Sequence, residues 1–282
     1  MSNNHLATAR RVKNDEFYTR YDDIEAEVKH YQLFFQNKVV YCNCDDGSSQ
    51  FKAYFTNHFY ELGLKTLYCT GASGEFYAFD GTAIITDTVD GDFRSQDCTA
   101  ILSEADIIVS NPPFSLFREY MHQLEGKDYL VLGNKAALSY KEVFPAFKNG
   151  TCRWGFTAPR YFDTPYGPVN LNGLCRWYTS FPKPSQELFE PTMSFSENAY
   201  QQFDWYPAIN VNRTSEIPAD YDGLMGVPVT ALDHLNGSYE IVDLIARYAV
   251  IDNSYDKKGH QLTEVNGKPK FSRMIIKKKT TK

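Results

Sequence analysis

Five short apolar runs, separated by longer stretches of mixed polarity, most constrain the fold of this chain. They are Val39–Cys42, Thr66–Cys69, Ala83–Thr86, Ile107–Val109 and Tyr129–Leu132. Short runs rich in β-branched and aromatic residues indicate buried strands, and their alternation with helical stretches between residues 38 and 181 is typical of βαβ units. Such units build a largely parallel sheet covered by helices. The sequence therefore predicts an α/β fold.

Three helices are predicted around these strands. Residues 22–35 form the first, and residues 51–62 form the second, which carries aromatic side chains on one face and is followed by Gly63. The third begins after the strand at Ile107–Val109, with Ser115 as its expected N-cap and Gly126 after its end.

A change of composition near Pro182 divides the chain. Arg176–Phe181 and Arg273–Lys277 have the pattern of antiparallel or edge strands, and Pro182-Lys183-Pro184 lies between them. A chain of 282 residues is long enough for one domain with an extension of roughly 100 residues. We therefore place a boundary between residues 1–182 and residues 183–282.

Composition disfavours several classes of protein. No apolar stretch approaches the roughly 20 residues that a membrane span needs, and the first residues lack the apolar core of a secretory signal. We therefore expect a cytoplasmic protein with no membrane partner.

The six cysteines have no paired CxxC spacing, which indicates buried free thiols rather than disulfides or a zinc site. No metal is expected.

The charge of the chain is unevenly distributed. A net charge of −6 counts against binding of nucleic acid, because affinity for the phosphate backbone comes from Lys and Arg. Near the C-terminus, however, Lys268, Lys270 and Arg273 precede Lys277-Lys278-Lys279, and the chain ends at Lys282. This basic patch suits a nucleic-acid partner, while a solubilising tail is the alternative interpretation of its last residues.

The four residues Asn111-Pro112-Pro113-Phe114 directly follow the predicted strand at Ile107–Val109. In open α/β sheets, ligands bind at the carboxyl ends of the strands. The Asn111 side-chain oxygen and the Pro112 carbonyl together could accept both N–H groups of a conjugated amine. They would favour a pyramidal nitrogen whose lone pair is available for attack. This pattern indicates methyl transfer to such an amine.

The remaining residues of the tetrad fit the same chemistry. Pro112 and Pro113 restrict the backbone and hold the carbonyl without adding a competing N–H. Phe114 offers a face on which a base swung out of a duplex can stack. Asn-Pro-Pro is also a common way to end a strand and begin a helix, and this purely structural role is the alternative.

Two acidic segments are candidates for the methyl-donor side of the pocket. Asn43, Asp45 and Asp46 follow the first strand, and their side chains suit the ammonium or ribose hydroxyls of a sulfonium nucleoside. The segment is not a GxGxxG turn, which a donor without a pyrophosphate does not require. Asp92 and Phe93 follow the third strand and suit the donor's adenine amine and ring. Both segments could equally be ordinary turns.

A third candidate segment, Asn14–Thr19, precedes the first helix. Thr19 could bond the donor's carboxylate, while Phe17 or Tyr18 could wall the pocket. A helix-leading cap is the simpler interpretation of this segment.

Taken in order, four segments of the chain resemble the adenine-specific DNA methyltransferases of the EcoRI methylase type: Asn14–Thr19, Cys42–Asp46, Gly91–Phe93 and Asn111–Phe114. The likeness continues at Leu224–Asp233, so it spans most of the sequence. It implies a Rossmann-like, S-adenosylmethionine-dependent methyltransferase fold with a mixed seven-stranded sheet. Residues 1–182 would form the catalytic domain, and residues 183–282 would form a C-terminal target-recognition extension.

The resemblance also implies roles for single residues. Asn111 and Pro112 would bind the adenine amine, and Phe114 would stack on the extruded base. Asp45, with Asp92 and Phe93, would line the donor site.

One position departs from the pattern of the wider class. Many of its members have an acidic residue at the end of the second strand that holds the ribose. Here that strand ends Cys69-Thr70-Gly71, with only Glu75 nearby.

We therefore predict an enzyme that transfers a methyl group from S-adenosylmethionine to the exocyclic amine of a flipped-out adenine in double-stranded DNA. Candidates for sequence specificity are the segment Arg160–Gly173 and the residues Asn210, Asn212, Arg213 and His234. Two alternatives stay open: the same chemistry on RNA or on a protein glutamine, and a catalytically silent DNA-binding decoy. The recognition sequence and any restriction partner cannot be derived from one chain.

Overall fold

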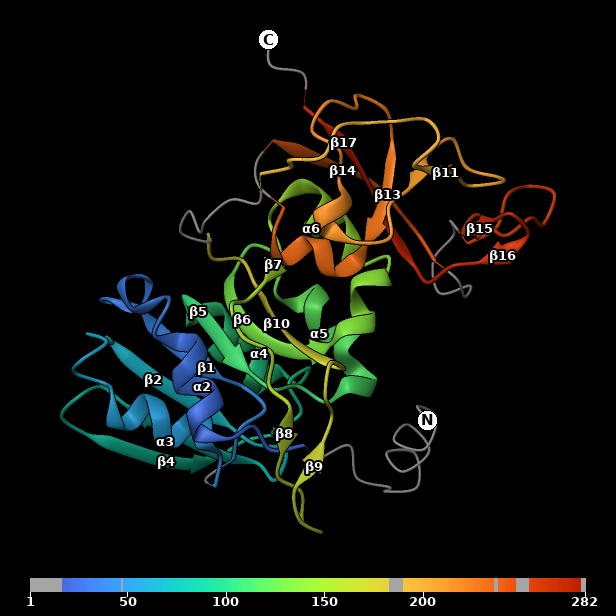
Figure 1. Cartoon of the computed structure of the whole chain (residues 1–282). Coiled ribbons are helices and arrows are strands. Elements are labelled where there is room, and N and C mark those ends of the chain that lie inside the picture. The colour runs from blue at the N-terminus through green and yellow to red at the C-terminus, as the bar shows by residue number, and fades with distance from the viewer. Residues whose placement is uncertain (1–16, 47, 183–189, 236–237, 247–253, 280–282) are drawn as a thin grey trace. The chain divides into compact units, whose positions relative to one another are not determined.

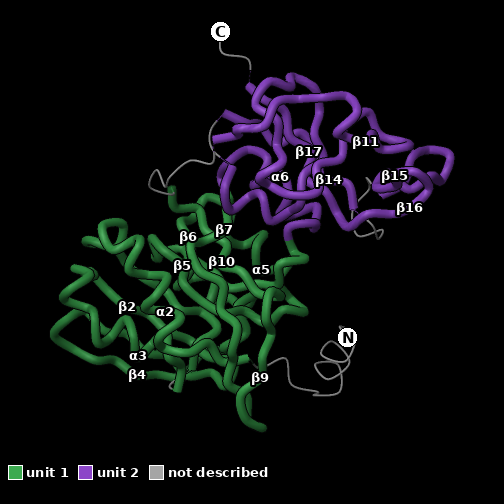
Figure 2. Tube along the Cα trace, viewed as in Figure 1, with its two compact units in different colours: residues 1–137, 152–182 green, residues 138–151, 183–282 purple. Residues whose placement is uncertain are grey.

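The chain forms two compact units in a computed structural model that describes residues 17–46, 48–182, 190–235, 238–246 and 254–279. Unit 1 comprises residues 1–137 and 152–182, and unit 2 comprises residues 138–151 and 183–282 (Figure 2). The segment 138–151 belongs to unit 2 because its helix α6 (Phe144–Asn149) contacts strand β14 (Tyr239–Ile245). The catalytic and recognition roles expected for residues 1–182 and 183–282 stay predictions.

Unit 1 is built on a mixed sheet of eight strands in the order β4-β3-β2-β1-β5-β6-β10-β7. Strands β2, β1, β5 and β6 are parallel to one another, and antiparallel strands extend both edges. The strands are β1 (Val39–Cys42), β2 (Thr66–Thr70), β3 (Glu75–Phe79), β4 (Ile84–Thr88), β5 (Ile107–Ser110), β6 (Asp128–Asn134), β7 (Arg153–Trp154) and β10 (Cys175–Thr179). The predicted mixed α/β fold is confirmed, with one strand more than expected.

Helices cover both faces of this sheet. Successive side chains of a strand point to opposite faces, so a buried strand packs against helices on both sides. Val40 packs with Ile24 of α2 and Phe55 of α3 in one apolar core. Its neighbour Tyr41 bonds Thr70, which also contacts Cys98 of α4. The helices of this unit are α2 (Tyr21–Val28), α3 (Gln50–Asn57), α4 (Gln96–Glu104) and α5 (Phe117–Gln123), with short 3-10 segments η1 (Gln32–Phe35) and η2 (Phe114–Leu116).

The predicted strand near Ala83–Thr86 is present as β4, but it pairs with a strand that the sequence analysis missed. β3 and β4 form an antiparallel hairpin rather than a βαβ unit. The Asp80 carboxylate closes the connecting turn by accepting the N–H groups of Thr82 and Ala83, each at 2.8 Å. Because this turn connects β3 directly to β4, no helix lies between the two strands.

All three predicted helices differ from the structure, and the one expected at residues 51–62 ends at Asn57, five residues early. The helix expected at residues 22–35 ends at Val28, and the chain turns before η1. Ser115 does not cap the helix after the tetrad, because it lies inside η2, where the Leu116 N–H bonds the Pro113 carbonyl at 3.0 Å. α5 begins only at Phe117.

Unit 2 contains a five-stranded sheet in the order β11-β12-β13-β17-β14. Its core includes Phe203, Ile245 and Ile275. The remaining elements of this unit are β11 (Gln201–Gln202), β12 (Ile209–Asn210), β13 (Met225–Pro228), β15 (Glu264–Val265), β16 (Lys268–Pro269), β17 (Arg273–Lys278), η4 (Thr214–Glu216) and η5 (Val229–Asp233). A further 3-10 segment, η3 (Lys135–Ser139), crosses the boundary between the units. The predicted antiparallel strand at Arg273–Lys277 is confirmed as β17.

A separate small hairpin of unit 1 consists of β8 (Tyr161–Phe162) and β9 (Val169–Asn170), and it lies within the segment 160–173 (Figure 1). All six cysteines are free thiols, and five of them are buried. Among the described residues there is no group of three or more side chains suited to hold a metal ion. No helix in the described ranges has the length and apolar character to cross a membrane.

Candidate active site

A cavity of about 880 Å³ lies at the carboxyl ends of β1 and β5. Parallel strands that are neighbours in a sheet present their carboxyl ends at the same edge, which brings distant segments together. The volume is toward the upper end of the roughly 300–1,000 Å³ typical of small-molecule sites. Eleven of the twelve predicted site residues line it: Phe17, Tyr18, Thr19, Asp45, Asp46, Asp92, Phe93, Asn111, Pro112, Pro113 and Phe114.

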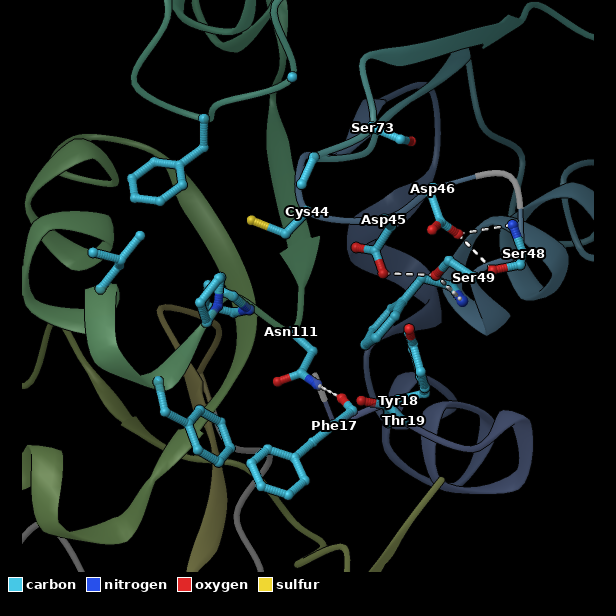
Figure 3. Close-up of a pocket in the computed structure, with 18 of the residues that line it drawn as sticks. Phe17, Tyr18, Thr19, Cys44, Asp45, Asp46, Ser48, Ser49, Ser73 and Asn111 are labelled. Atoms are coloured by element: carbon cyan, nitrogen blue, oxygen red, sulfur yellow. Dashed lines mark hydrogen bonds between the residues drawn. The ribbon is translucent and has the colours of Figure 1, made fainter. Parts of the chain in front are cut away.

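The side-chain amide of Asn111 is held in one orientation. Its nitrogen donates a hydrogen bond to the Phe17 carbonyl, and Figure 3 shows the amide oxygen on the opposite side. That oxygen is buried and has no partner among the described residues. Asn111 therefore presents an oriented acceptor at the cavity.

Both prolines of the tetrad line the cavity, and the carbonyl of one of them takes part in the local backbone structure. The Pro113 carbonyl is occupied by the Leu116 N–H, which starts η2. Pro112 lines the cavity beside Asn111, and as a proline it contributes no N–H. The backbone of the tetrad is thus fixed without adding a donor at Pro112.

Phe114 belongs to a short series of aromatic contacts. Its ring is stacked with that of Phe17, with centroids 5.7 Å apart and an interplanar angle of 24°. Phe17 in turn meets the buried Phe162 edge-on at 6.3 Å. A flat apolar surface therefore lies in the same cavity as the Asn111 acceptor.

The Asp45 carboxylate is buried in the wall of the cavity, with 6% of the residue exposed. Ser49 and Ser110 donate hydrogen bonds to its two oxygens at 2.6 and 2.7 Å. Burial raises the pKa of Asp45 to about 7, although these two bonds act in the opposite direction, and the nearby Asp46 raises the pKa further. None of the described side chains that influence Asp45 is a cation, and a buried carboxylate in such surroundings favours a positively charged ligand.

Asp46 is the second carboxylate on this side of the cavity. One of its oxygens accepts the Ser48 N–H at 2.9 Å and the Ser48 hydroxyl at 2.6 Å. Its backbone lies so close to Gly71 that a Cβ at Gly71 would stand 2.5 Å from the Asp46 Cβ. This contact gives a physical reason for glycine after β2.

Asp92 and Phe93 enter the cavity wall from the loop before α4. Both carboxylate oxygens of Asp92 accept hydrogen bonds from Arg94, at 2.9 and 2.7 Å, and these bonds lower the pKa of Asp92 to about 2. Arg94 also bonds Glu119 at 2.8 Å. Phe93 is buried and packs edge-on against Tyr120 with centroids 5.2 Å apart.

Asn43 is the one predicted site residue that does not line the cavity. It is buried, and its side-chain oxygen accepts a hydrogen bond from the Tyr120 hydroxyl, while its amide nitrogen has no partner among the described residues. Asn43 lies directly before the wall residues Cys44 and Asp45, so its position supports the wall from behind rather than forming it.

The segment Phe17–Thr19 is held in place by residues far along the chain. Tyr18 and Asp163 exchange two backbone hydrogen bonds at 2.8 and 3.0 Å, and Arg20 bonds the Asp163 carboxylate at 2.9 Å. Thr19 is buried, and its hydroxyl has no partner among the described residues. Residues 14–16, which share the predicted motif, lie outside the described ranges.

Several wall and supporting residues were missed from the sequence. Ser110 ends β5 and reaches Asp45 across the sheet, and Asp163 comes from the β8–β9 hairpin. A polar residue at the end of a predicted strand was a usable signal for Ser110, whereas nothing local marks Asp163. Glu75 lines a smaller neighbouring pocket with Asp46, while Ser73 lines the main cavity.

Comparison with known proteins identifies the family. A family model described as adenine-specific methyltransferase EcoRI matches residues 5–88 and 77–279. The chain belongs to this family. It is an adenine-specific methyltransferase, which confirms the predicted enzyme class and the predicted resemblance.

Three relatives of this methyltransferase align along almost their whole length. The Type II methyltransferase M.MgeORF184P of Mycoplasma genitalium is 37% identical, covering 97% of this chain and 98% of that protein. M.MpnI of Mycoplasma pneumoniae is 36% identical over 96% and 97% of the two chains, and M.EcoRI of Escherichia coli is 35% identical over 99% and 97%. No solved structure matches the chain significantly. Site-specific methylation of DNA is the function that these findings support.

Proposed function

We propose that the protein transfers a methyl group from S-adenosylmethionine to the exocyclic amine of an adenine that has been flipped out of double-stranded DNA. The observation that carries this proposal is the Asn111 amide, whose oxygen is oriented, buried and without a partner at the cavity. Buried polar atoms are normally paired, so an acceptor left open beside an aromatic face suits a ligand that carries an N–H group.

Asn111 and Pro112 would act as acceptors for the two amine protons of the base. Bonding both protons favours a pyramidal nitrogen, because the lone pair is then withdrawn less strongly into the ring. The lone pair forms the bond to the methyl carbon, the electrons of the carbon–sulfur bond return to sulfur, and the nitrogen releases one proton to solvent. Phe114 would hold the ring plane by stacking during this step.

The other end of the cavity fits the methyl donor. S-adenosylmethionine supplies an electrophilic methyl group on a positively charged sulfur, together with an ammonium and a carboxylate. Asp45 and Asp46 provide negative charge in the wall, and the unpartnered Thr19 hydroxyl is a donor for a carboxylate. Phe93 supplies an apolar face for the donor's adenine, whereas Asp92 could bond its amine only alongside Arg94.

The C-terminal segment of unit 2 carries the positive charge that a DNA partner requires. Residues 254–282 contain nine Lys and Arg against two Asp and Glu, although the whole chain is acidic. Lys257, Lys258 and Lys268 are exposed. Arg273, by contrast, is buried and bonds the Asn210 side chain at 3.1 Å, and Lys278 bonds the Ala219 carbonyl. Lys279 is exposed as well, so four exposed lysines lead the proposed contacts to phosphates, while Lys282 lies outside the described residues.

Among the residues considered for base readout, Asn210 is excluded by its surroundings. It is buried, its oxygen accepts from Arg273, and its nitrogen donates to Asn212 at 3.0 Å. Arg213 and His234 are exposed and keep their proposed role. Arg and Lys pair with guanine edges in the major groove, so Arg213 is the stronger candidate.

The decisive experiment incubates the purified protein with methyl-labelled donor and mixed-sequence DNA, RNA and protein. We expect label in DNA, at adenine, and its loss in the Asn111→Ala variant. Asn57→Ala, which changes an exposed asparagine on α3, is the matched control and should keep wild-type activity. Incorporation unaffected by Asn111→Ala would remove that residue from the mechanism.

Other outcomes would favour the alternatives. Label in RNA or in protein glutamine, but not in DNA, would change the substrate. Binding of DNA without any affinity for the donor in calorimetry would indicate a silent decoy. Sequencing that detects modified bases, applied to DNA from cells expressing the protein, would then give the recognition site.

A further inference from the structure

The β8–β9 hairpin is anchored firmly at its base. Phe162 of β8 is fully buried in the core of unit 1 and contacts Phe17, which stacks on Phe114. Asp163 lines the cavity and is bound through its backbone to Tyr18 and through its side chain to Arg20. The base of the hairpin is therefore continuous with the wall of the proposed active site.

The tip of the hairpin is a tight turn that presents one aromatic side chain. Thr164 and Gly167 exchange backbone hydrogen bonds at 3.2 and 3.0 Å, and the Thr164 hydroxyl bonds the Gly167 carbonyl at 2.7 Å. Pro165 lies within this turn and Pro168 directly follows it, and both restrict the backbone. Tyr166, between them, is 78% exposed.

We propose that Tyr166 enters the DNA duplex and fills the space that the extruded adenine leaves, an inference that rests on the proposed function. Asp163 is part of the cavity wall, and three residues of chain span at most about 11 Å. The ring of Tyr166 is therefore presented close to the cavity that would receive the base. Rigid apolar wedges that enter a base step are a general means of holding distorted DNA.

The physical role of the wedge is to compensate for lost stacking. Extruding a base exposes the faces of its two neighbours, and an aromatic ring can stack between them. A tyrosine suits this place because it is planar, has few rotatable bonds and carries a polar end for the groove. Single exposed aromatic residues are common on proteins, but Tyr166 combines exposure with a braced turn that adjoins the site.

The test compares Tyr166→Ala with the wild type on two duplexes that contain the recognition site. In one duplex the target adenine is paired, and in the other it faces an abasic position, so that extrusion breaks no base pair. On the paired duplex we expect Tyr166→Ala to lower the single-turnover rate of methylation about tenfold or more. On the unpaired duplex stacking is still lost, but no base pair is broken and the total cost of extrusion is smaller, so the loss should shrink to within about threefold of the wild-type rate.

Two controls separate this role from others. Tyr60→Ala removes another exposed tyrosine of unit 1, 74% exposed, and should change neither rate. Tyr166→Trp should retain activity on the paired duplex. Fluorescence of 2-aminopurine at the target position should rise on binding of the wild type and rise less with Tyr166→Ala.

The inference is overturned if Tyr166→Ala keeps the wild-type rate on the paired duplex, or if it loses activity equally on both duplexes. An equal loss would show a role in general DNA contact. Should the wild type methylate neither duplex, the proposed function itself fails, and the wedge fails with it.

Discussion

Replacing Asp45 with Asn is expected to stabilise the free protein at alkaline pH while it weakens binding of the donor. The Asp45 carboxylate is buried, and its pKa is raised to about 7 from an ordinary value of 3.8. Between these two values the unfolded chain releases the proton and the folded protein retains it. The free energy of unfolding of the wild type therefore falls as the pH rises through this window, and the loss is complete above pH 7.

The size of the effect follows from the pKa difference. At about 1.4 kcal/mol per unit, the full penalty is about 4 to 5 kcal/mol, as an upper bound. Between pH 5 and pH 8 the contribution of Asp45 should change by about 2 to 3 kcal/mol. The Asp45→Asn variant has no carboxyl there, and its amide can still accept a hydrogen bond from Ser49 or Ser110.

The assay is urea denaturation of both proteins at several pH values from 5 to 8, in the absence of donor. The stability of the variant relative to the wild type should increase from pH 5 to about pH 7 and level off above it. Asp87→Asn, which changes an exposed carboxylate of β4, controls for the loss of a surface charge. A difference between Asp45→Asn and the wild type that stays constant over this range would refute the reasoning.

The Asp45→Asn substitution should weaken binding of the methyl donor, although it stabilises the free protein at alkaline pH. A cationic ligand beside Asp45 favours the ionised carboxylate, so affinity of the wild type should weaken as the pH falls below 7. Loss of one charged contact should weaken binding about tenfold to a hundredfold in calorimetry, and the pH dependence should disappear. Unchanged affinity would place Asp45 outside the donor site.

Three further substitutions test packing and the base side of the cavity. Glu27→Gln should lower the free energy of unfolding by about 2 to 4 kcal/mol in urea denaturation, because the buried carboxylate accepts hydrogen bonds from Tyr31, Phe156 and Thr157; the exposed Glu25→Gln should change it little. Gly91→Ala should lower the melting temperature more than Gly126→Ala, because an added Cβ would stand 1.9 Å from the Gly71 carbonyl oxygen, whereas Gly126 has nothing within 4 Å; equal shifts would contradict this. Phe114→Ala should lower the rate of methyl transfer about tenfold or more, and Phe114→Tyr should retain it; equal loss in both variants would argue against stacking.

The parallel centre of the sheet could be predicted because its strands are buried on both faces. Val39–Cys42 and Ile107–Ser110 are buried along their whole length, and all their residues except the terminal Ser110 are apolar or aromatic, a signal that is local. β3 was missed because Glu75–Phe79 carries a mixed, half-exposed pattern, although it lies between β2 and the edge strand β4. The predicted helical connection to β4 was therefore wrong. A hairpin turn takes its place, and this turn depends on the few hydrogen bonds that the Asp80 carboxylate accepts.

The cavity residues that directly follow a strand could be predicted from the sequence. Those that reach the cavity through backbone pairing between distant segments could not. The tetrad at Asn111 and the acids at Asp45 and Asp46 follow strands, so topology brings them to one edge. Asp163 joins them only because its hairpin pairs with Tyr18, a contact that no local pattern records. Asn43 was misplaced by the same limit, because it bonds the hydroxyl of Tyr120, a distant residue of α5, instead of lining the cavity.

The sequence left a purely structural turn as the alternative role of the tetrad, and the hydrogen bonds of Asn111 argue against it. An asparagine kept for a turn or helix start accepts a backbone N–H with its side-chain oxygen. Here the first bond of η2 goes to the Pro113 carbonyl, no side chain caps η2 or α5, and the Asn111 oxygen stays buried without a partner. Such an acceptor costs about 1 to 3 kcal/mol in the free protein. A purely structural turn does not need an unpaired acceptor, whereas a site that binds an amine does.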